Sequence, residues 1–131
     1  NSARYLHAAS LLANGKVLVT GGISASGTVN TTELYHPSTG QWITTGHMKY
    51  ARYYHATSVL ANGKVIAAGG YNGSFLSSAE LYGPSTGSWT ATYNMNTSRI
   101  YHTASVLTNG QVLITGGYNG IYLSNSELYH P

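Results

Sequence analysis

The sequence contains no cysteine and no aspartate, and only 7% of its 131 residues are charged. Without thiols, the chain has no disulfide, no thiolate nucleophile and no thiolate metal ligand. Its net charge of +3 comes from lysines and arginines that are spread along the chain, which argues against nucleic-acid binding. No apolar run approaches the roughly 20 residues that cross a bilayer, and no signal peptide precedes Asn1, so we predict no membrane contact.

What the chain does contain favours strands and tight turns. Hydrophobic residues make up 42% of it, they alternate with polar ones, and Gly, Ser, Thr, Asn and Tyr are abundant. A chain of this length can bury a substantial core. The composition therefore predicts an ordered all-β protein.

The chain repeats itself with a period of 47 or 48 residues. A fixed period of this length indicates a repeat architecture. The positions in step are Arg4, Arg52 and Arg99; His7, His55 and His102; Gly21-Gly22, Gly69-Gly70 and Gly116-Gly117; Glu33, Glu80 and Glu127; Tyr35, Tyr82 and Tyr129; and Trp42 and Trp89. The period divides the chain into units at 1–48, 49–95 and 96–131, and the third lacks a counterpart of the tryptophan.

Each unit is predicted to be an antiparallel meander of four short strands. In the second unit we expect them near 52–60, 64–69, 77–82 and 88–93. An Asn-Gly pair between the first two strands predicts a type I′ hairpin, at Asn14-Gly15, Asn62-Gly63 and Asn109-Gly110. A Pro-Ser-Thr-Gly turn links the last two strands, at 37–40 and 84–87.

A four-stranded unit with a double glycine, then Glu-Leu-Tyr, then tryptophan resembles the kelch repeat, and the resemblance covers essentially the whole chain. The Gly-His and Trp-Asp signatures of WD-type propellers are absent. The resemblance implies a partial β-propeller: three kelch blades around a central channel, the third without its outer strand. Closed propellers have at least four blades, so three cannot close a ring.

Most of the residues in step are predicted to be structural. Each glutamate is expected to accept hydrogen bonds from an arginine at a blade junction rather than to act as a catalytic acid. The double glycines allow close backbone approach, and the large tyrosine and tryptophan rings fill the wedges between blades. The three histidines are expected to pack, since zinc ligands must converge on one ion at about 2 Å. We therefore predict no metal site, no cofactor and no catalytic residue.

A binding site is predicted on the rim that carries the connections from second to third strands and from blade to blade. Kelch repeats commonly recognise partners on this rim. Tyrosine with small polar residues is the composition of adaptable recognition surfaces. The candidate binding residues are Tyr50, Tyr53, Tyr71, Asn72, Phe75, Tyr93, Tyr118, Asn119 and Tyr122. An alternative is that these tyrosines only cover the ends of the blades.

These features predict a non-enzymatic module that binds a protein or a glycan. One alternative is a structural subunit of an extracellular fibre or matrix. Another is a propeller fragment of a carbohydrate-active or copper oxidase-like enzyme, although the galactose oxidase type requires a Cys-linked tyrosine, which this chain lacks. Open blade faces predict self-association into a six-bladed dimer or a filament, or the remainder of a longer propeller. Sequons at Asn30, Asn72 and Asn96 suggest a secreted glycoprotein.

Overall fold

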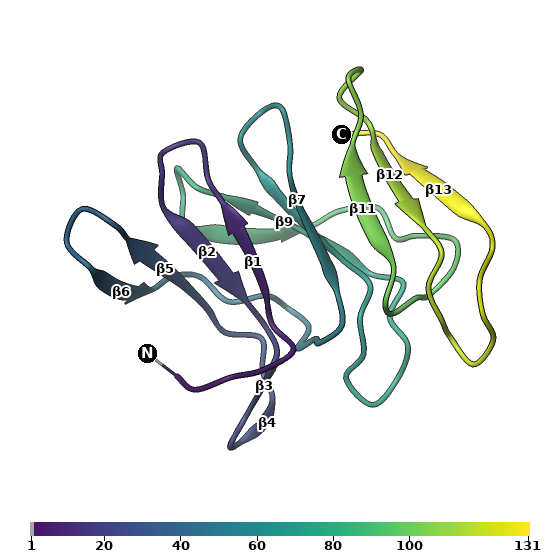
Figure 1. Ribbon diagram of the computed structural model, residues 1–131, viewed down its shortest axis with the longest axis horizontal. Coiled ribbons are helices and arrows are strands. Elements are labelled where there is room, and N and C mark those ends of the chain that lie inside the picture. The colour runs from purple at the N-terminus through teal and green to yellow at the C-terminus, as the bar shows by residue number, and fades with distance from the viewer. Residues whose placement is uncertain (1) are drawn as a thin grey trace.

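The structure is a computed structural model that describes residues 2–131, and it is all-β: none of these residues lies in a helix. It therefore offers no helix long and apolar enough to cross a membrane within that range. Three antiparallel sheets and one small hairpin account for the strands (Figure 1). The predicted fold class, a partial kelch propeller, is confirmed.

The first two sheets have four strands each, and the third has three. The first contains β1 (Ala8–Leu11), β2 (Val17–Thr20), β5 (Thr32–His36) and β6 (Gln41–Thr44). The second contains β7 (Ala56–Val59), β8 (Val65–Ala68), β9 (Ala79–Gly83) and β10 (Ser88–Ala91). The third contains β11 (Thr103–Val106), β12 (Val112–Thr115) and β13 (Ser126–Tyr129), and β3 (Ile23–Ser24) pairs with β4 (Gly27–Thr28).

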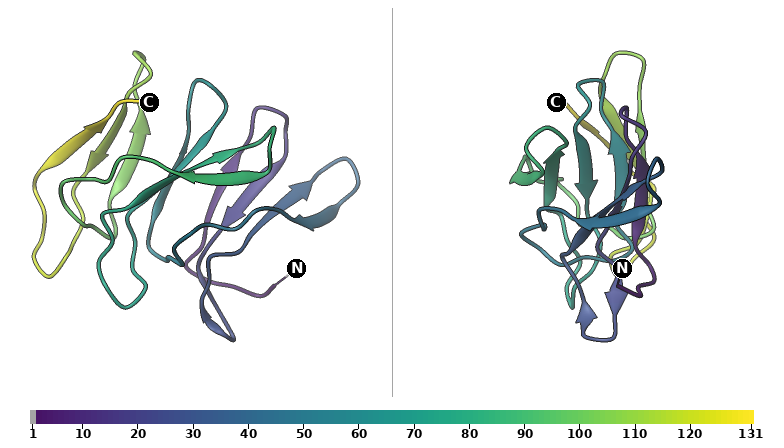
Figure 2. Two further views of the ribbon diagram at one scale, coloured as in Figure 1. Left: turned by 180° about the vertical axis from the view of Figure 1, so that it is seen from behind. Right: turned by 90° about the vertical axis from the view of Figure 1, so that its left-hand side faces the viewer.

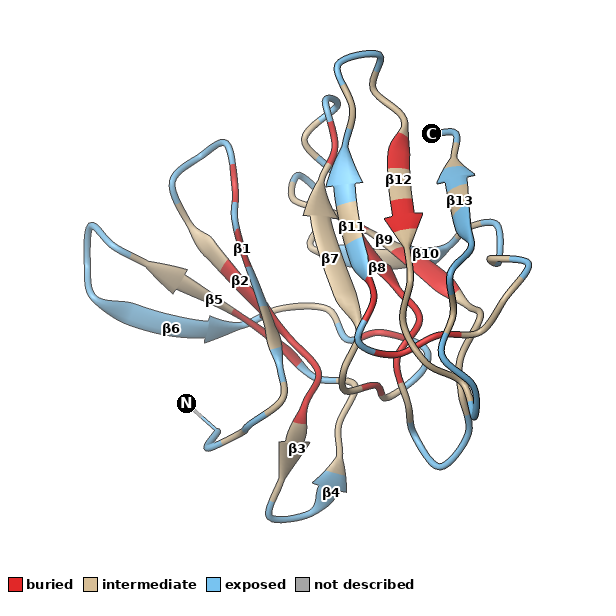
Figure 3. Cartoon of the chain, turned by 45° about the vertical axis from the view of Figure 1, so that its right-hand side comes forward, coloured by how far each residue is buried: buried red, intermediate tan, exposed pale blue. Residues whose placement is uncertain are grey.

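The sheets stand side by side like the blades of a fan, with β1, β7 and β11 as adjacent innermost strands (Figures 1 and 2). The hydrophobic core lies between neighbouring blades. One cluster contains Leu18, Val65 and Tyr82 from the first two blades, and another contains Ile66 and Ile114 from the second and third. Figure 3 shows this burial concentrated at the junctions, whereas the outer strand β6 is exposed.

The first strand of the second blade is shorter than predicted. We expected it from residue 52, but β7 begins at Ala56. Tyr54 has a φ of 55°, which no extended strand can accommodate, and the Arg52 side chain turns inward to an ion pair. The chain thus reaches the inner strand through a fixed bend that the alternation of residues did not reveal.

The hairpins between first and second strands are not of the predicted type I′, which needs two positive φ angles. Only the glycine is left-handed: Gly15 has a φ of 82°, and Asn14 is not among the residues with positive φ. The Gly15 amide donates to the Leu12 carbonyl, and the Asn14 Oδ1 accepts from the Lys16 amide at 3.0 Å. This is a type I turn followed by a glycine bulge, repeated at 60–64 and 107–111.

Candidate functional site

Each blade contains one buried ion pair between an arginine just before its first strand and a glutamate on its third. The N–O distances are 3.0 Å for Arg4–Glu33, 2.7 Å for Arg52–Glu80 and 2.8 Å for Arg99–Glu127. The arginine and glutamate side chains of the second blade are only 0% and 2% exposed. All acidic side chains of the sequence are therefore held in structural pairs.

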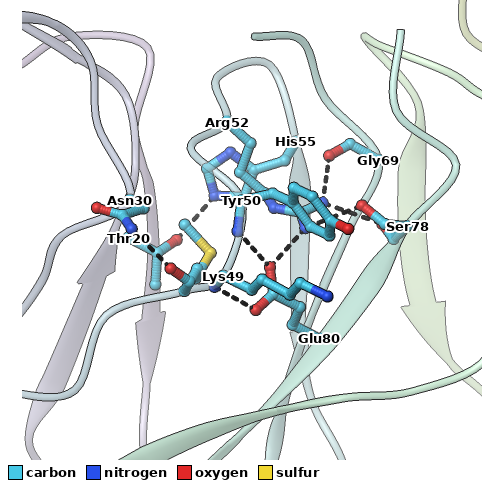
Figure 4. A network of polar contacts seen from close by, with 10 residues as sticks. Thr20, Asn30, Lys49, Tyr50, Arg52, His55, Gly69, Ser78 and Glu80 are labelled. Atoms are coloured by element: carbon cyan, nitrogen blue, oxygen red, sulfur yellow. Dashed lines mark hydrogen bonds and ion pairs between the residues drawn. The ribbon is translucent and has the colours of Figure 1, made fainter.

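The pair in the second blade belongs to a wider network (Figure 4). Arg52 also donates to the carbonyls of Gly69 and Ser78, at 2.7 and 3.0 Å. Glu80 accepts from the backbone amides of Lys49 and Tyr50, at 2.6 and 3.2 Å. These amides lie on the segment that leads from the first blade to the second. The network therefore fixes where that segment enters its blade.

The third blade repeats this arrangement, and its hydrogen bonds shift the pKa of Glu127. Burial alone would raise the pKa of Glu127, but hydrogen bonds from the Asn96 amide and the Arg99 guanidinium lower it below the usual value. The carboxylate thus stays charged at neutral pH. It is an acceptor for the connecting segment and not a proton donor.

Two of the three histidines connect neighbouring blades. The Nε2 atom of His55 lies 2.8 Å from the Thr20 hydroxyl, and the Nε2 of His102 donates to the Ala68 carbonyl at 2.9 Å. Burial, together with nearby arginine charges, lowers the pKa of His55 to about 3 and that of His102 to about 4. His7, in the first blade, is exposed. Both of these rings are neutral at physiological pH.

The double glycines of the first and second blades lie where one blade touches the next. At Gly69 and Gly70, which both have positive φ, a Cβ would lie 2.6 Å from the Arg99 carbonyl oxygen and 2.8 Å from that of Tyr53. The Gly70 amide also donates to the Arg99 carbonyl at 3.0 Å. A side chain at Gly69 would push the second and third blades apart, and one at Gly70 would clash with the backbone of its own blade.

The large aromatic rings fill the junctions only where a neighbouring blade is present. Tyr82 is fully buried, and its hydroxyl lies 2.7 Å from that of Thr45 in the first blade. Trp89 donates from Nε1 to Thr32 across the same junction at 3.3 Å. Trp42 has no such partner and is 38% exposed, so the expectation that it belongs to the core is wrong for this residue.

Nothing in the described range, residues 2–131, points to a metal centre, since no group of three or more His, Cys, Asp or Glu side chains is suitably placed. The three glutamates, which catalysis would use, are held in ion pairs within their own blades. What the surface offers instead is a rim of tyrosines. This arrangement suits non-covalent binding.

Seven aromatic rings form a continuous row on that rim, which we call the aromatic row. Successive ring centroids are 4.3–5.9 Å apart and the rings are tilted or edge-on, a geometry that aromatic pairs prefer. In order, the row consists of Tyr101, Tyr54, Tyr53, Tyr71, Phe75, Tyr118 and Tyr122. It runs over the second and third blades and ends in exposed rings, Tyr101 at 61% and Tyr122 at 92%.

Backbone contacts hold the row in place. Tyr53 and Tyr71 exchange two amide-to-carbonyl hydrogen bonds of 3.1 and 2.9 Å, and Tyr118 makes the equivalent pair with Ile100. Further bridges join Tyr71 to Phe75 and Tyr118 to Tyr122. The rings are thus presented on paired backbone rather than on free loops, which reduces the entropy that a ligand must overcome.

Two rings of the row occupy an unusual backbone conformation. Leu6, Tyr54 and Tyr101 share one repeat position, with φ angles of 57°, 55° and 57°, a left-handed region that bulky side chains rarely adopt. The equivalent conformation in all three blades makes the bend a property of the repeat. The tyrosines that use it in the second and third blades bring their rings to 4.3 Å of each other.

Two tyrosines of the row, Tyr53 and Tyr101, have a raised pKa. Burial and the neighbouring hydroxyls of Tyr71 and Tyr54 raise the pKa of Tyr53, and the Tyr54 side chain raises the pKa of Tyr101. These two phenols therefore keep their protons at physiological pH and act as O–H donors. A ligand meets an uncharged surface that combines aromatic faces with hydrogen-bond donors.

The structure brings together five of the predicted binding residues: Tyr53, Tyr71, Phe75, Tyr118 and Tyr122. Two others lie outside the row. Tyr50 packs under the Lys49 amino group, 5.2 Å from its ring centroid, and Tyr93 is 83% exposed. Asn72 is exposed and Asn119 is half-buried, each in a turn beside the row.

Sequence analysis missed Tyr54 and Tyr101. The signal was present, because both directly precede a histidine that recurs in step, but hydrophobic alternation assigns them to a strand. Their side chains are directed by the positive φ, which the sequence pattern does not encode.

A second surface feature is a groove of about 290 Å³ beside the exposed strand β13, lined by Ile66, Ala79, Tyr93, Ile114, Leu128 and Tyr129 among others. At the preceding junction, the equivalent place is occupied by Trp89, which packs with Tyr82 and Leu18. The groove therefore belongs to the blade stacking and is separate from the aromatic row.

The comparison with protein families agrees with this geometry. The family model described as the kelch motif matches residues 4–49 and 52–96, which is more than half of the chain. The chain therefore belongs to the kelch-motif family. Kelch repeats generally mediate protein binding or assembly and are typically non-enzymatic. No curated protein matches the chain.

Proposed function

We propose that this chain is a non-enzymatic recognition module, and that the aromatic row with its flanking turns forms the contact surface for a protein or glycan partner. The observation that carries the proposal is the unbroken contact of seven rings across two blades on a backbone-paired rim. Tyrosine offers large contact area at low entropic cost and a donor at the ring tip. Its enrichment matches that of residues that dominate binding energy at interfaces.

We propose no catalysis because the arginine and glutamate side chains are held in structural contacts. Arg52 and Arg99 each bond to two backbone carbonyls and one carboxylate. Moving such a group toward a substrate would leave its buried partner unpaired, at a cost of roughly 3–5 kcal/mol. The side chains near the row offer hydrogen bonds and apolar area, and the contact between the Thr20 hydroxyl and the His55 imidazole is not an accessible nucleophile–base pair, because Thr20 is only 1% exposed.

The test is binding of the labelled chain to peptide and glycan arrays, repeated with Tyr71→Ala and Tyr118→Ala. Both variants interrupt the row at its centre. We expect ligands of the wild-type chain to lose signal with both variants and to keep it with Tyr93→Ala, which changes an exposed tyrosine outside the row. Signals that are equal in all four proteins would refute the proposal.

A second candidate role is assembly through the open blade faces, which the exposed apolar side chains there favour. Leu11 and Trp42 of the first blade are 68% and 38% exposed, and Leu128 of the third is 47% exposed. A second copy of the chain or further blades would cover these surfaces. Light scattering of the isolated chain tests self-association: a discrete dimer or polymer supports it, and a monomer at high concentration contradicts it.

We also propose that the protein is extracellular, with Asn72 and Asn96 as glycan acceptors, because both are exposed. Asn30 serves as the control within the same chain. It is half-buried, and its side-chain nitrogen donates to the Met48 carbonyl at 2.8 Å. Expression through a secretory pathway, followed by peptide mass spectrometry, should find glycans at Asn72 and Asn96 and none at Asn30. Unmodified Asn72 and Asn96 in secreted protein would contradict the proposal.

A further inference from the structure

The aromatic row is not required by the propeller fold. Positions that serve the fold, such as the paired arginines and glutamates, are filled identically in all three blades. The row positions are not: Leu6 stands where the other blades have Tyr54 and Tyr101, and Ile23 stands where they have Tyr71 and Tyr118. The first blade folds into the same sheet without them. The aromatic residues of the second and third blades therefore serve something other than folding.

The chemistry of the row points to an uncharged ligand that needs donors. No carboxylate is available beside it, because Glu80 and Glu127 face their arginines inside the blades. The exposed cation Lys49 lies over Tyr50, which is outside the row. The tyrosine hydroxyls supply O–H donors, and the ring faces supply apolar area.

A proline-rich segment in the polyproline II conformation meets these requirements. Its prolines have no N–H groups, so its backbone presents carbonyl acceptors without competing donors. Its flat rings pack against aromatic side chains, which is how proline-rich segments are bound in aromatic-lined grooves. Because the helix is already extended in solution, little further ordering opposes its binding.

The row also offers this ligand rings from two blades. It crosses from the third blade to the second at Tyr101–Tyr54 and returns to the third at Phe75–Tyr118. An extended polyproline II segment, which advances about 9 Å per turn of three residues, would contact rings of both blades when it lies across their junction.

We propose that the aromatic row binds proline-rich segments in the polyproline II conformation, with Tyr53, Tyr71 and Tyr118 at the centre of the site. This inference rests on the proposed recognition function and specifies its ligand class. The backbone bridges at these residues keep the rings in position before the ligand arrives.

The experiment uses fluorescein-labelled decaproline, with a Gly-Ser decapeptide as the comparison, and measures fluorescence anisotropy as the full chain is titrated. We expect decaproline to bind and the Gly-Ser peptide not to bind. Tyr71→Ala should weaken decaproline binding by about ten-fold or more, the loss typical of a central contact residue. Tyr71→Phe, which keeps the ring and removes the hydroxyl, should cause a smaller loss.

Two further variants guard against an effect of misfolding. Tyr122→Ala truncates the most exposed ring of the row, 92% exposed, and should weaken binding while leaving the melting temperature unchanged. Tyr93→Ala removes a ring of similar exposure outside the row, 83%, and should leave decaproline binding intact. Equal affinity in all variants would overturn the inference.

The outcome also separates this inference from the proposed function. If array ligands depend on the row but decaproline does not bind, the proline-rich ligand is wrong and the recognition surface stands. A row-dependent titration with cellohexaose in place of decaproline would reassign the row to glycans. If neither arrays nor decaproline show dependence on the row, both proposals fail.

Discussion

The strongest test of the blade junctions is removal of the Arg52 guanidinium. Arg52→Met leaves the Glu80 carboxylate, 2% exposed, without its cation, and it leaves the Gly69 and Ser78 carbonyls without their donor. Loss of one partner of a buried ion pair costs roughly 3–5 kcal/mol. Glu80 keeps two backbone donors, so we expect a loss within this range rather than above it.

The assay is urea unfolding followed by tryptophan fluorescence, with Glu80→Gln and the double variant completing a cycle. Since domains of this kind are stable by only about 5–15 kcal/mol, Arg52→Lys provides a milder change that keeps the charge but not the planar fork. Lys64→Met is the control, because it removes a positive charge from an exposed residue and should change stability by less than about 0.5 kcal/mol.

The double-mutant cycle of Arg52 and Glu80 also shows which result would refute this reasoning. If the two single variants are coupled through one buried pair, the double variant should lose less stability than the singles together, by about 1 kcal/mol or more. A loss below about 1 kcal/mol for Arg52→Met, or strictly additive effects, would show that the pair does not hold the junction.

Two further predictions concern the same junctions. Lowering the pH from 7 to 4.5 should reduce the melting temperature, because the folded protein keeps His55 and His102 neutral, with pKa values of about 3 and about 4, whereas the unfolded chain takes up protons near pH 6.5. Between pH 6.5 and its folded pKa, each histidine lowers the free energy of unfolding by about 1.4 kcal/mol per pH unit. Calorimetry across this pH range measures the effect, and a constant melting temperature would contradict the reasoning. Trp89→Ala should lower the stability by about 3–5 kcal/mol, because the Trp89 ring packs between two blades. Trp42→Ala should lower it clearly less, because Trp42 lies at an open face. Equal losses in urea unfolding would show that the neighbouring blade does not decide the burial of these rings.

Much of the fold could be predicted because the signals are local and repeated. The spacing of Gly21-Gly22 and Gly69-Gly70 fixes the period, and each hairpin joins strands that are adjacent in sequence. Even there, the prediction of the turn type was wrong. Asn-Gly is compatible with more than one turn, and the hydrogen bond from the Lys16 amide to the Asn14 side chain accompanies the type I turn with a bulge.

The candidate site was predictable only in part. A tyrosine in a turn of the rim is recognisable as a binding candidate, so Tyr71 and Tyr118 were found. Whether rings meet depends on atoms far apart in the chain: Tyr54 and Tyr101 are neighbours only because the blades stack and because both backbones turn left-handed. Tyr93, equally plausible from the sequence, lies outside the row.

The sequence by itself determined the period, the meander of each blade and the residues that recur in step, since these depend on side-chain alternation and turn chemistry within about 50 residues. Only the tertiary structure decided which rings form the aromatic row, that Trp42 is exposed while Tyr82 is buried, and that His55 and His102 are held neutral. These properties depend on burial and contacts between blades, and a side chain acquires them only when a neighbouring sheet packs against it.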